Sequence, residues 1–147
     1  MKIMVALLLP LVCSVAVAQE ELSLFDGSGR AVAYVVADDD LTIHLWSGEP
    51  VAYLARSGTN DFNVYGFNGK HLGWFVDGVV RDHDGDVTCA LRDAIANAQL
   101  EPLKSLKSLR PLRSLRELAP LRPLSGAGSR CERGATLSAG KADMQHD

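Results

Sequence analysis

Hydrophobic and polar positions follow one pattern four times between residues 22 and 91, each time around a short turn. The four segments are LFDGSGRAVAYV, IHLWSGEPVAYL, VYGFNGKHLGWF and VRDHDGDVTCAL. A Ser, Asn or Asp precedes the glycine of each turn, and Asn-Gly or Asp-Gly between strand-like runs is a strong signal of a two-residue hairpin turn, in which both residues take positive φ. We therefore predict four consecutive β-hairpins that turn at Gly29, Gly48, Gly69 and Gly85.

The strands on either side of these turns repeat two columns of residues. Aliphatic residues stand five positions before the four glycines, and small residues stand four positions after them: Leu24, Ile43, Val64 and Val80, and then Ala33, Ala52, Gly73 and Cys89. A two-residue turn makes the two columns face each other. The positions that follow are also mostly apolar, so both faces of each hairpin are apolar. Because a lone hairpin is marginally stable, the sequence predicts an all-β fold, a compact pseudo-fourfold module over residues 19–91.

The repeats resemble the bacterial 4-fold beta flower family over about residues 22–124. The resemblance is carried by LFDGSGRAVAYV, DDDLTIHLWSGEPVAYL, VYGFNGKHLGWF and VRDHDG, together with the tail LKSLKSLRPLRSL. It implies a fold of four hairpins followed by a tail of triplets, and it supplies no catalytic residues. The fourth repeat departs from the pattern at Thr88 and Ala90, where the other repeats have Val or Leu and Tyr or Trp.

A leucine recurs at every third position of the tail, from Leu100 to Leu124. An α-helix would spread leucines of this period over all its faces, whereas a polyproline II helix has three residues per turn. In that conformation the leucines form one edge, most cations a second, and Ser and Pro a third. Burying nine leucines would contribute about 18 kcal/mol, less than the roughly 25–50 kcal/mol needed to order 25 residues. Leucine burial alone therefore does not fix the tail, and hydrogen bonds or charge attraction have to help.

The net charge of −3 conceals an acidic body and a basic tail. Residues 19–99 carry 13 acidic and 5 basic side chains, and residues 100–124 carry two glutamates against six cations: Lys104, Lys107, Arg110, Arg113, Arg116 and Arg122. Two interpretations follow. The tail docks as a strap on its own acidic domain, around which it must curve, or it projects as an arm toward an anionic envelope surface or partner. Nucleic acid is an improbable partner because no aromatic residues are interleaved with the cations to stack on bases.

The chain ends outside the hairpins have separate roles in this prediction. Residues 1–18 read as a secretory signal that ends at Ala16-Val17-Ala18, so we expect an exported protein, periplasmic or secreted, with no transmembrane segment after signal removal. Residues 92–99 are expected to form a short helical linker, and residues 125–147 have the composition of disorder. In an oxidising compartment Cys89 and Cys131 are able to pair or to stay reduced, and the sequence leaves both options open.

No set of residues with the spacing of a catalytic, cofactor or metal site stands out. Asp82 to Asp86 lacks the bidentate glutamate of a calcium loop, and Asp38 to Asp40 lies between hairpins, where solvated acids are expected. The histidines His44, His71 and His83 fall in different columns of the repeat. We therefore expect a non-enzymatic structural or interaction module without a cofactor. The alternative is a small ligand-binding or glycan-binding domain, or a hydrolase, that uses exposed aromatic residues such as Trp46.

Overall fold

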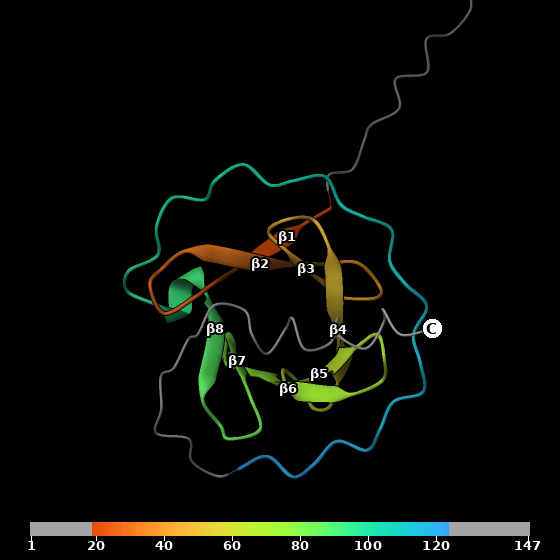
Figure 1. The fold of residues 1–147 in the computed structure, drawn as a ribbon. Helices are drawn as coiled ribbons and strands as arrows, with labels where there is room; N and C mark the ends of the chain where they lie inside the picture. Colours follow the sequence, from red (N-terminus) through yellow and green to blue (C-terminus); the bar gives the residue numbers. More distant parts are fainter. Residues whose placement is uncertain (1–18, 124–147) are drawn as a thin grey trace, which may run out of the picture.

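The computed structural model describes residues 19–123, and these form an all-β barrel surrounded by an extended chain (Figure 1). Eight antiparallel strands follow one another around the barrel in chain order, and β8 pairs with β1 to close it. The strands are β1 (Glu21–Phe25), β2 (Ala31–Val36), β3 (Thr42–Leu45), β4 (Pro50–Arg56), β5 (Phe62–Gly66), β6 (His71–Val76), β7 (Val79–Arg81) and β8 (Val87–Leu91). The prediction of four consecutive hairpins in an all-β fold is confirmed.

The hairpin turns differ from the predicted two-residue turns. In the first hairpin Asp26 N–H donates to Arg30 O, and Gly29 N–H donates back to Asp26 O, which encloses a three-residue loop. Gly29 alone has positive φ (+80°), and the residue before it stays at negative φ. The same two hydrogen bonds recur at the turns that contain Gly48, Gly69 and Gly85. The two-residue assignment was therefore wrong, because a single left-handed glycine completes a turn of this longer kind.

The predicted facing of the two columns is nevertheless confirmed. Each longer turn shifts the register by one residue, and an extra residue in the second strand of the hairpin restores it before the columns meet. These bulged residues are Val32, Val51, Leu72 and Thr88. Beyond them the aliphatic and small residues pair as expected, as in Leu24 with Ala33 and Ile43 with Ala52. A β-bulge also increases local twist, which helps a sheet of short strands to close.

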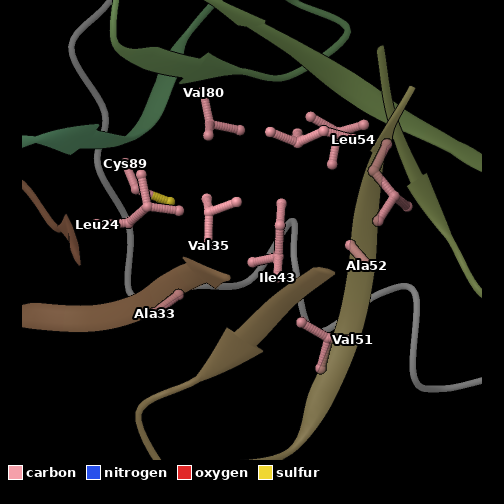
Figure 2. Packing of buried hydrophobic residues seen from close by; sticks show 11 residues of the cluster. Leu24, Ala33, Val35, Ile43, Val51, Ala52, Leu54, Val80 and Cys89 are labelled. Carbon is pink, nitrogen blue, oxygen red and sulfur yellow. The ribbon is translucent and has the colours of Figure 1, made fainter. Parts of the chain in front are cut away.

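The two columns form the interior of the barrel (Figure 2). Leu24, Ile43, Val64 and Val80 have no exposed surface. Alternation of large and small side chains suits the narrow interior of an eight-stranded barrel. Gly73 is required at its place in the small column, because its φ is +153° and a Cβ atom there would lie 1.9 Å from Arg81 O of the paired strand β7. Tyr34, Tyr53 and Tyr65 stand next to column residues in their strands and so face the opposite, outer side of the wall, whereas Phe62 and Phe75 pack against the interior cluster.

The chain after β8 leaves the barrel through one short turn and then runs around it. The predicted helical linker of residues 92–99 is reduced to a 3-10 turn, η1 (Arg92–Ala94). Residues 96–123, called the strap below, have no regular secondary structure and curve around the outside of the barrel (Figure 1). No helix within residues 19–123 is long and apolar enough to cross a membrane. The predicted signal segment, residues 1–18, and the predicted disordered segment, residues 125–147, lie outside the described residues.

Candidate functional site: the strap on the outer wall

Backbone N–H groups of the strap donate to carbonyl oxygens at the hairpin turns. Ser108 donates to Gly48 O (2.9 Å) and Glu117 donates to Gly69 O (3.0 Å). Gln99 donates in the same way to Gly29 O (2.8 Å). The three donors are nine residues apart, and their acceptors are the turn glycines of successive hairpins. One hairpin of the barrel therefore corresponds to three triplets of the strap.

A second set of donors has the same period of nine. Ser105 donates to Trp46 O (3.3 Å) and Ser114 to Phe67 O (2.8 Å). The donors Ser105, Ser108, Ser114 and Glu117 occupy the third position of the Leu-x-x triplet, and Gln99 directly precedes the first triplet. The remaining third positions are prolines, which have no N–H to donate: Pro102, Pro111, Pro120 and Pro123. At the fourth turn, Gly85 O accepts from the Arg81 guanidinium (2.9 Å), and the position nine residues after Glu117 lies outside the described residues.

The turn glycines let the strap approach closely. A Cβ atom on Gly48 would lie 2.0 Å from Leu106 O, and one on Gly69 would lie 2.0 Å from Leu115 O. At Gly29 the corresponding atom is Asn97 O, at 1.9 Å. These glycines were predicted only as turn residues, and Gly29, Gly48 and Gly69 have the second role of admitting the strap backbone.

The cations of the strap point to the barrel and pair with acids at its edges. Lys104 Nζ lies 2.7 Å from Glu21, Arg113 lies 2.9 Å from Asp40, and Arg122 lies 3.3 Å from Asp61. These cations are nine residues apart, and the acids recur with the hairpins. Lys107 shares Glu21 (2.6 Å), and Arg110 shares Asp40. Arg116 lies over the Tyr65 ring instead. All six cations predicted as partner contacts thus lie against the protein's own barrel.

Glu21 shows the electrostatic effect of this arrangement. Burial by itself would raise the pKa of the Glu21 carboxyl. Hydrogen bonds and charge attraction from Lys104 and Lys107 outweigh burial and hold the pKa below its ordinary value. The carboxylate is therefore stabilised in its charged form by the strap.

Aromatic clusters on the outer wall lie beneath these cations. Tyr34 stacks on His44 with ring centroids 5.3 Å apart, and Tyr53 packs on Phe67 at 5.7 Å. Lys104 Nζ lies 4.5 Å from the Tyr34 ring centroid, and the Arg113 guanidinium lies 3.9 Å from that of Tyr53. These are cation–π distances. Both tyrosines are at least 98% buried, so they belong to the core of the strapped barrel.

Two polar atoms in the first aromatic cluster are buried without a hydrogen-bond partner among the described residues, the Tyr34 hydroxyl and His44 Nδ1. Burial raises the pKa of Tyr34, helped by the nearby Glu21 carboxylate. Burial also lowers the pKa of His44, helped by Lys107. Both side chains are therefore neutral at pH 7, which suits an apolar environment.

A third cluster joins two histidines that fall in different columns of the repeat. His71 Nδ1 lies 2.9 Å from His83 Nε2, and His71 Nε2 lies 3.2 Å from Asn63 Oδ1. Since the amide oxygen only accepts, Nε2 of His71 is assigned the proton and Nδ1 accepts from His83. Burial lowers the pKa of His71 to about 4, and the charge of His83 adds to this effect. His71 is therefore a neutral acceptor near pH 7.

The signal for this pair was present in the aligned repeats. His71 stands two residues after one turn glycine, and His83 stands two residues before the next. The pairing of β6 with β7 places the two hairpins side by side and brings these positions together. Glu117 of the strap covers the pair, because its carboxylate accepts from His71 N–H (2.6 Å) and its carbonyl accepts from the Tyr65 hydroxyl (3.1 Å).

The leucines of the strap point away from the barrel. From Leu100 to Leu121 all eight are 94–98% exposed. Burial of the leucines, one contribution to docking expected from the sequence, is absent for these eight. The cations and the third-position N–H groups make the contacts instead, which agrees with the need for hydrogen bonds and charge attraction. Leu124 lies outside the described residues.

The remaining candidate residues have structural surroundings. Asp38 and Asp82 accept N–H groups of their own turns. Residues 19–123 contain no group of three or more His, Cys, Asp or Glu side chains arranged to hold a metal ion. Cys89 is buried in the barrel interior, and its possible partner Cys131 lies outside the described residues.

The fold is that of a closed barrel of four hairpins, belted by its own C-terminal chain. A family model described as 4-fold beta flower protein matches residues 22–131. Because this match spans more than half of the sequence, the chain belongs to the 4-fold beta flower family. No curated protein and no solved structure matches it.

Proposed function

We propose that this protein is a non-catalytic interaction module in which the basic tail is part of the fold and presents leucines to a partner. The observation that carries the proposal is the opposite orientation of two side-chain sets on one strap. The leucines are 94–98% exposed, while the neighbouring cations pair with Glu21, Asp40 and Asp61. A tail evolved only to clamp the barrel has no need for leucine at positions whose side chains are almost fully exposed, since exposed apolar rows mark interaction surfaces.

The inward cations also argue against a free basic arm. Five of the six form ion pairs with barrel acids, and Arg116 lies 5.5 Å from the Tyr65 ring centroid. A partner that needed these cations would have to displace the strap from its own barrel. The proposed module therefore offers an apolar surface rather than a cationic one.

Limited trypsin digestion of the chain from residue 19 tests whether the strap is part of the fold. Cleavage is followed by mass spectrometry after Lys104, Lys107, Arg113 and Arg116, because Arg110 and Arg122 precede prolines. We expect cleavage there to be as slow as global unfolding measured under the same conditions. Rapid cleavage that leaves an intact barrel would contradict the proposal and return the tail to the role of a free arm.

We further propose that the module is exported to the periplasm or secreted. The support is the apolar segment before Ala16-Val17-Ala18. The mass of the protein recovered from a periplasmic or culture fraction of a bacterial host tests it, with a mature chain that begins at Gln19 expected. A full-length chain that stays in the cytosolic fraction would contradict export.

The alternative is a glycan-binding or hydrolytic domain that uses its aromatic residues. Trp46 is the half-buried member of its cluster, and its indole N–H donates to Pro102 O in the strap (3.2 Å). The alternative predicts saturable glycan binding that Trp46→Ala weakens while the fold survives. It also predicts turnover that a substitution at His44, His71 or His83 abolishes. Unfolding of Trp46→Ala without any glycan binding by the parent protein favours the interaction module.

A further inference from the structure

The eight exposed leucines form a curved ridge with a regular spacing. Three residues of a polyproline-like chain advance roughly 9 Å, and three triplets correspond to one hairpin, which is a quarter of the barrel. Neighbouring leucines are therefore about 30° apart on an arc of radius about 18 Å, from the same rise of 3.1 Å per residue. The strap backbone curves around the barrel (Figure 1), and its eight leucines, each 94–98% exposed, form a ridge one residue wide on the outside.

The chemistry of the ridge is unlike that of a protein-binding surface. Protein interfaces concentrate binding energy in aromatic and arginine side chains seated in complementary pockets, whereas this ridge consists of leucine alone. The strap N–H groups at positions 99, 105, 108, 114 and 117 point inward and are already bonded. Two convex ridges from two copies would touch over only two or three leucines each, far below the roughly 800 Å² per partner of a stable dimer.

We infer that the leucine ridge inserts edge-on into the hydrocarbon boundary of a lipid bilayer. A fluid acyl surface is the partner that requires apolar area but neither hydrogen bonds nor a matching shape. The inference rests on the proposed function, because it assigns a partner to the surface that the strap presents.

The arc geometry fixes how many leucines take part at one time. When one leucine is lowest, its two neighbours lie about 2–3 Å higher and the next pair about 9 Å higher, on the arc derived from the chain rise. Amphipathic segments bury their apolar side about 5–10 Å into the interface. Three adjacent leucines therefore enter the bilayer together, and a single arc of three is sufficient for binding.

The charge arrangement predicts which lipids suffice. Five of the six strap cations are paired with barrel acids and Arg116 lies over the Tyr65 ring, so the ridge has no unpaired cation row beside it in residues 96–123. Binding should not depend on anionic headgroups. Vesicles of phosphatidylcholine alone and vesicles with one third phosphatidylglycerol are expected to bind the protein within about threefold of each other, which is less than one decade of affinity.

Two variants of identical composition test the arc. Both are made in the chain from residue 19 and replace four leucines by serine. The alternating variant changes Leu103, Leu109, Leu115 and Leu121, which destroys every group of three neighbours. The contiguous variant changes Leu112, Leu115, Leu118 and Leu121, which leaves the arc from Leu100 to Leu109 intact. Because these side chains are almost fully exposed, thermal unfolding of both variants should match that of the parent, and this is measured first.

Vesicle co-sedimentation gives the partition coefficients. The alternating variant should bind about 100-fold more weakly than the parent, at about tenfold for each of two lost neighbours, and the contiguous variant within about threefold of the parent. Equal weakening of vesicle binding in both variants would contradict the claim that three neighbouring leucines insert together. Binding only to phosphatidylglycerol vesicles would overturn the leucine inference and show that the cations bind the membrane. Leucine-dependent dimerisation without vesicle binding would overturn it and show that the partner is a second copy of the chain. If the parent protein binds no vesicles while its strap resists trypsin, only the lipid partner is refuted. If the strap is cleaved rapidly, the proposed function is refuted as well.

Discussion

The two faces of the barrel wall are stabilised by different physics, although the same fourfold repeat lies behind both. On the inner face, side chains such as Leu24 and Ile43 are fully buried and pack on small residues of the facing strand. On the outer face, the strap is attached by its N–H groups and its cations while its leucines remain in solvent. Leucine therefore has opposite roles in the two regions, and its role follows from the element that carries it rather than from its hydrophobicity.

The largest expected effect comes from one substitution made in both regions. Leu24→Ala should lower the free energy of unfolding by about 2–5 kcal/mol, because it leaves a cavity in the interior. Leu112→Ala, at a position 94% exposed, should change it by less than about 0.5 kcal/mol. Urea unfolding followed by tryptophan fluorescence measures both. Equal losses would show that the leucines of the strap are buried in solution.

His71, a barrel residue hydrogen-bonded to Glu117 of the strap, should make the free energy of unfolding depend on pH. Its pKa of about 4 lies below that of an unfolded histidine, near 6.5. The unfolded chain therefore binds the proton first, and stability present above pH 6.5 is lost as the pH falls toward 4, by roughly 3 kcal/mol. His71→Gln should remove this slope when the unfolding free energies of parent and variant are subtracted at each pH. Parallel pH profiles would mean that His71 is not buried as a neutral acceptor.

Alanine substitutions at two glycines of similar conformation distinguish the cost of a clash with the strap from the cost of backbone strain in the turn. Gly48 and Gly78 have φ of +85° and +77°. The nearest atom to a Cβ on Gly78 is 3.6 Å away, whereas Leu106 O lies 2.0 Å from a Cβ on Gly48. Gly78→Ala should cost about 1 kcal/mol from left-handed strain alone, and Gly48→Ala about 2 kcal/mol or more, with faster tryptic cleavage after Lys107. Similar cleavage rates in the two variants would contradict contact between this turn and the strap.

The smallest effect concerns the ion pairs. Glu21→Gln should lower the unfolding free energy by about 1 kcal/mol at low salt, because Glu21 pairs with two partly exposed lysines. The difference should shrink at 1 M NaCl, where screening is strong. Because the pKa of Glu21 is lowered by its partners, this contribution is present above about pH 4.5 and is lost as the pH falls through the lowered value. Glu20→Gln, at the exposed neighbouring position, is the control and should have no effect.

The alternation of residues was sufficient to predict the hairpins and the facing of their inner columns. Leu24 and Ala33 pair as expected even though the turn is one residue longer, because the bulge at Val32 compensates for it. Such a bulge leaves no distinct mark in a sequence where Val32 resembles its strand neighbours. The period of three in the tail likewise predicted an extended chain with separate edges.

What the sequence did not reveal was which edge of the tail faces the barrel. Hydrophobicity favours leucine as the buried edge, yet the outer wall offers carbonyls at Gly48 and Gly69 and carboxylates at Asp40 and Asp61, which only N–H groups and cations satisfy. The nine-residue spacing of Pro102, Pro111 and Pro120 was a usable signal. Proline has no backbone N–H, so it marks the triplets that do not donate a hydrogen bond to the barrel from their third position. The meeting of His71 with His83 depends on the pairing of β6 with β7, which joins two consecutive hairpins.

Amide hydrogen exchange of the chain from residue 19, resolved by NMR, tests the central claim most directly. If the strap is attached through its third-position N–H groups, Ser105, Ser108, Ser114 and Glu117 should be protected, while the amides of Leu103, Leu106, Leu112 and Leu115 exchange quickly. Protection should repeat with a period of nine residues along the strap. Uniformly fast exchange, or protection confined to the leucine amides, would contradict the account.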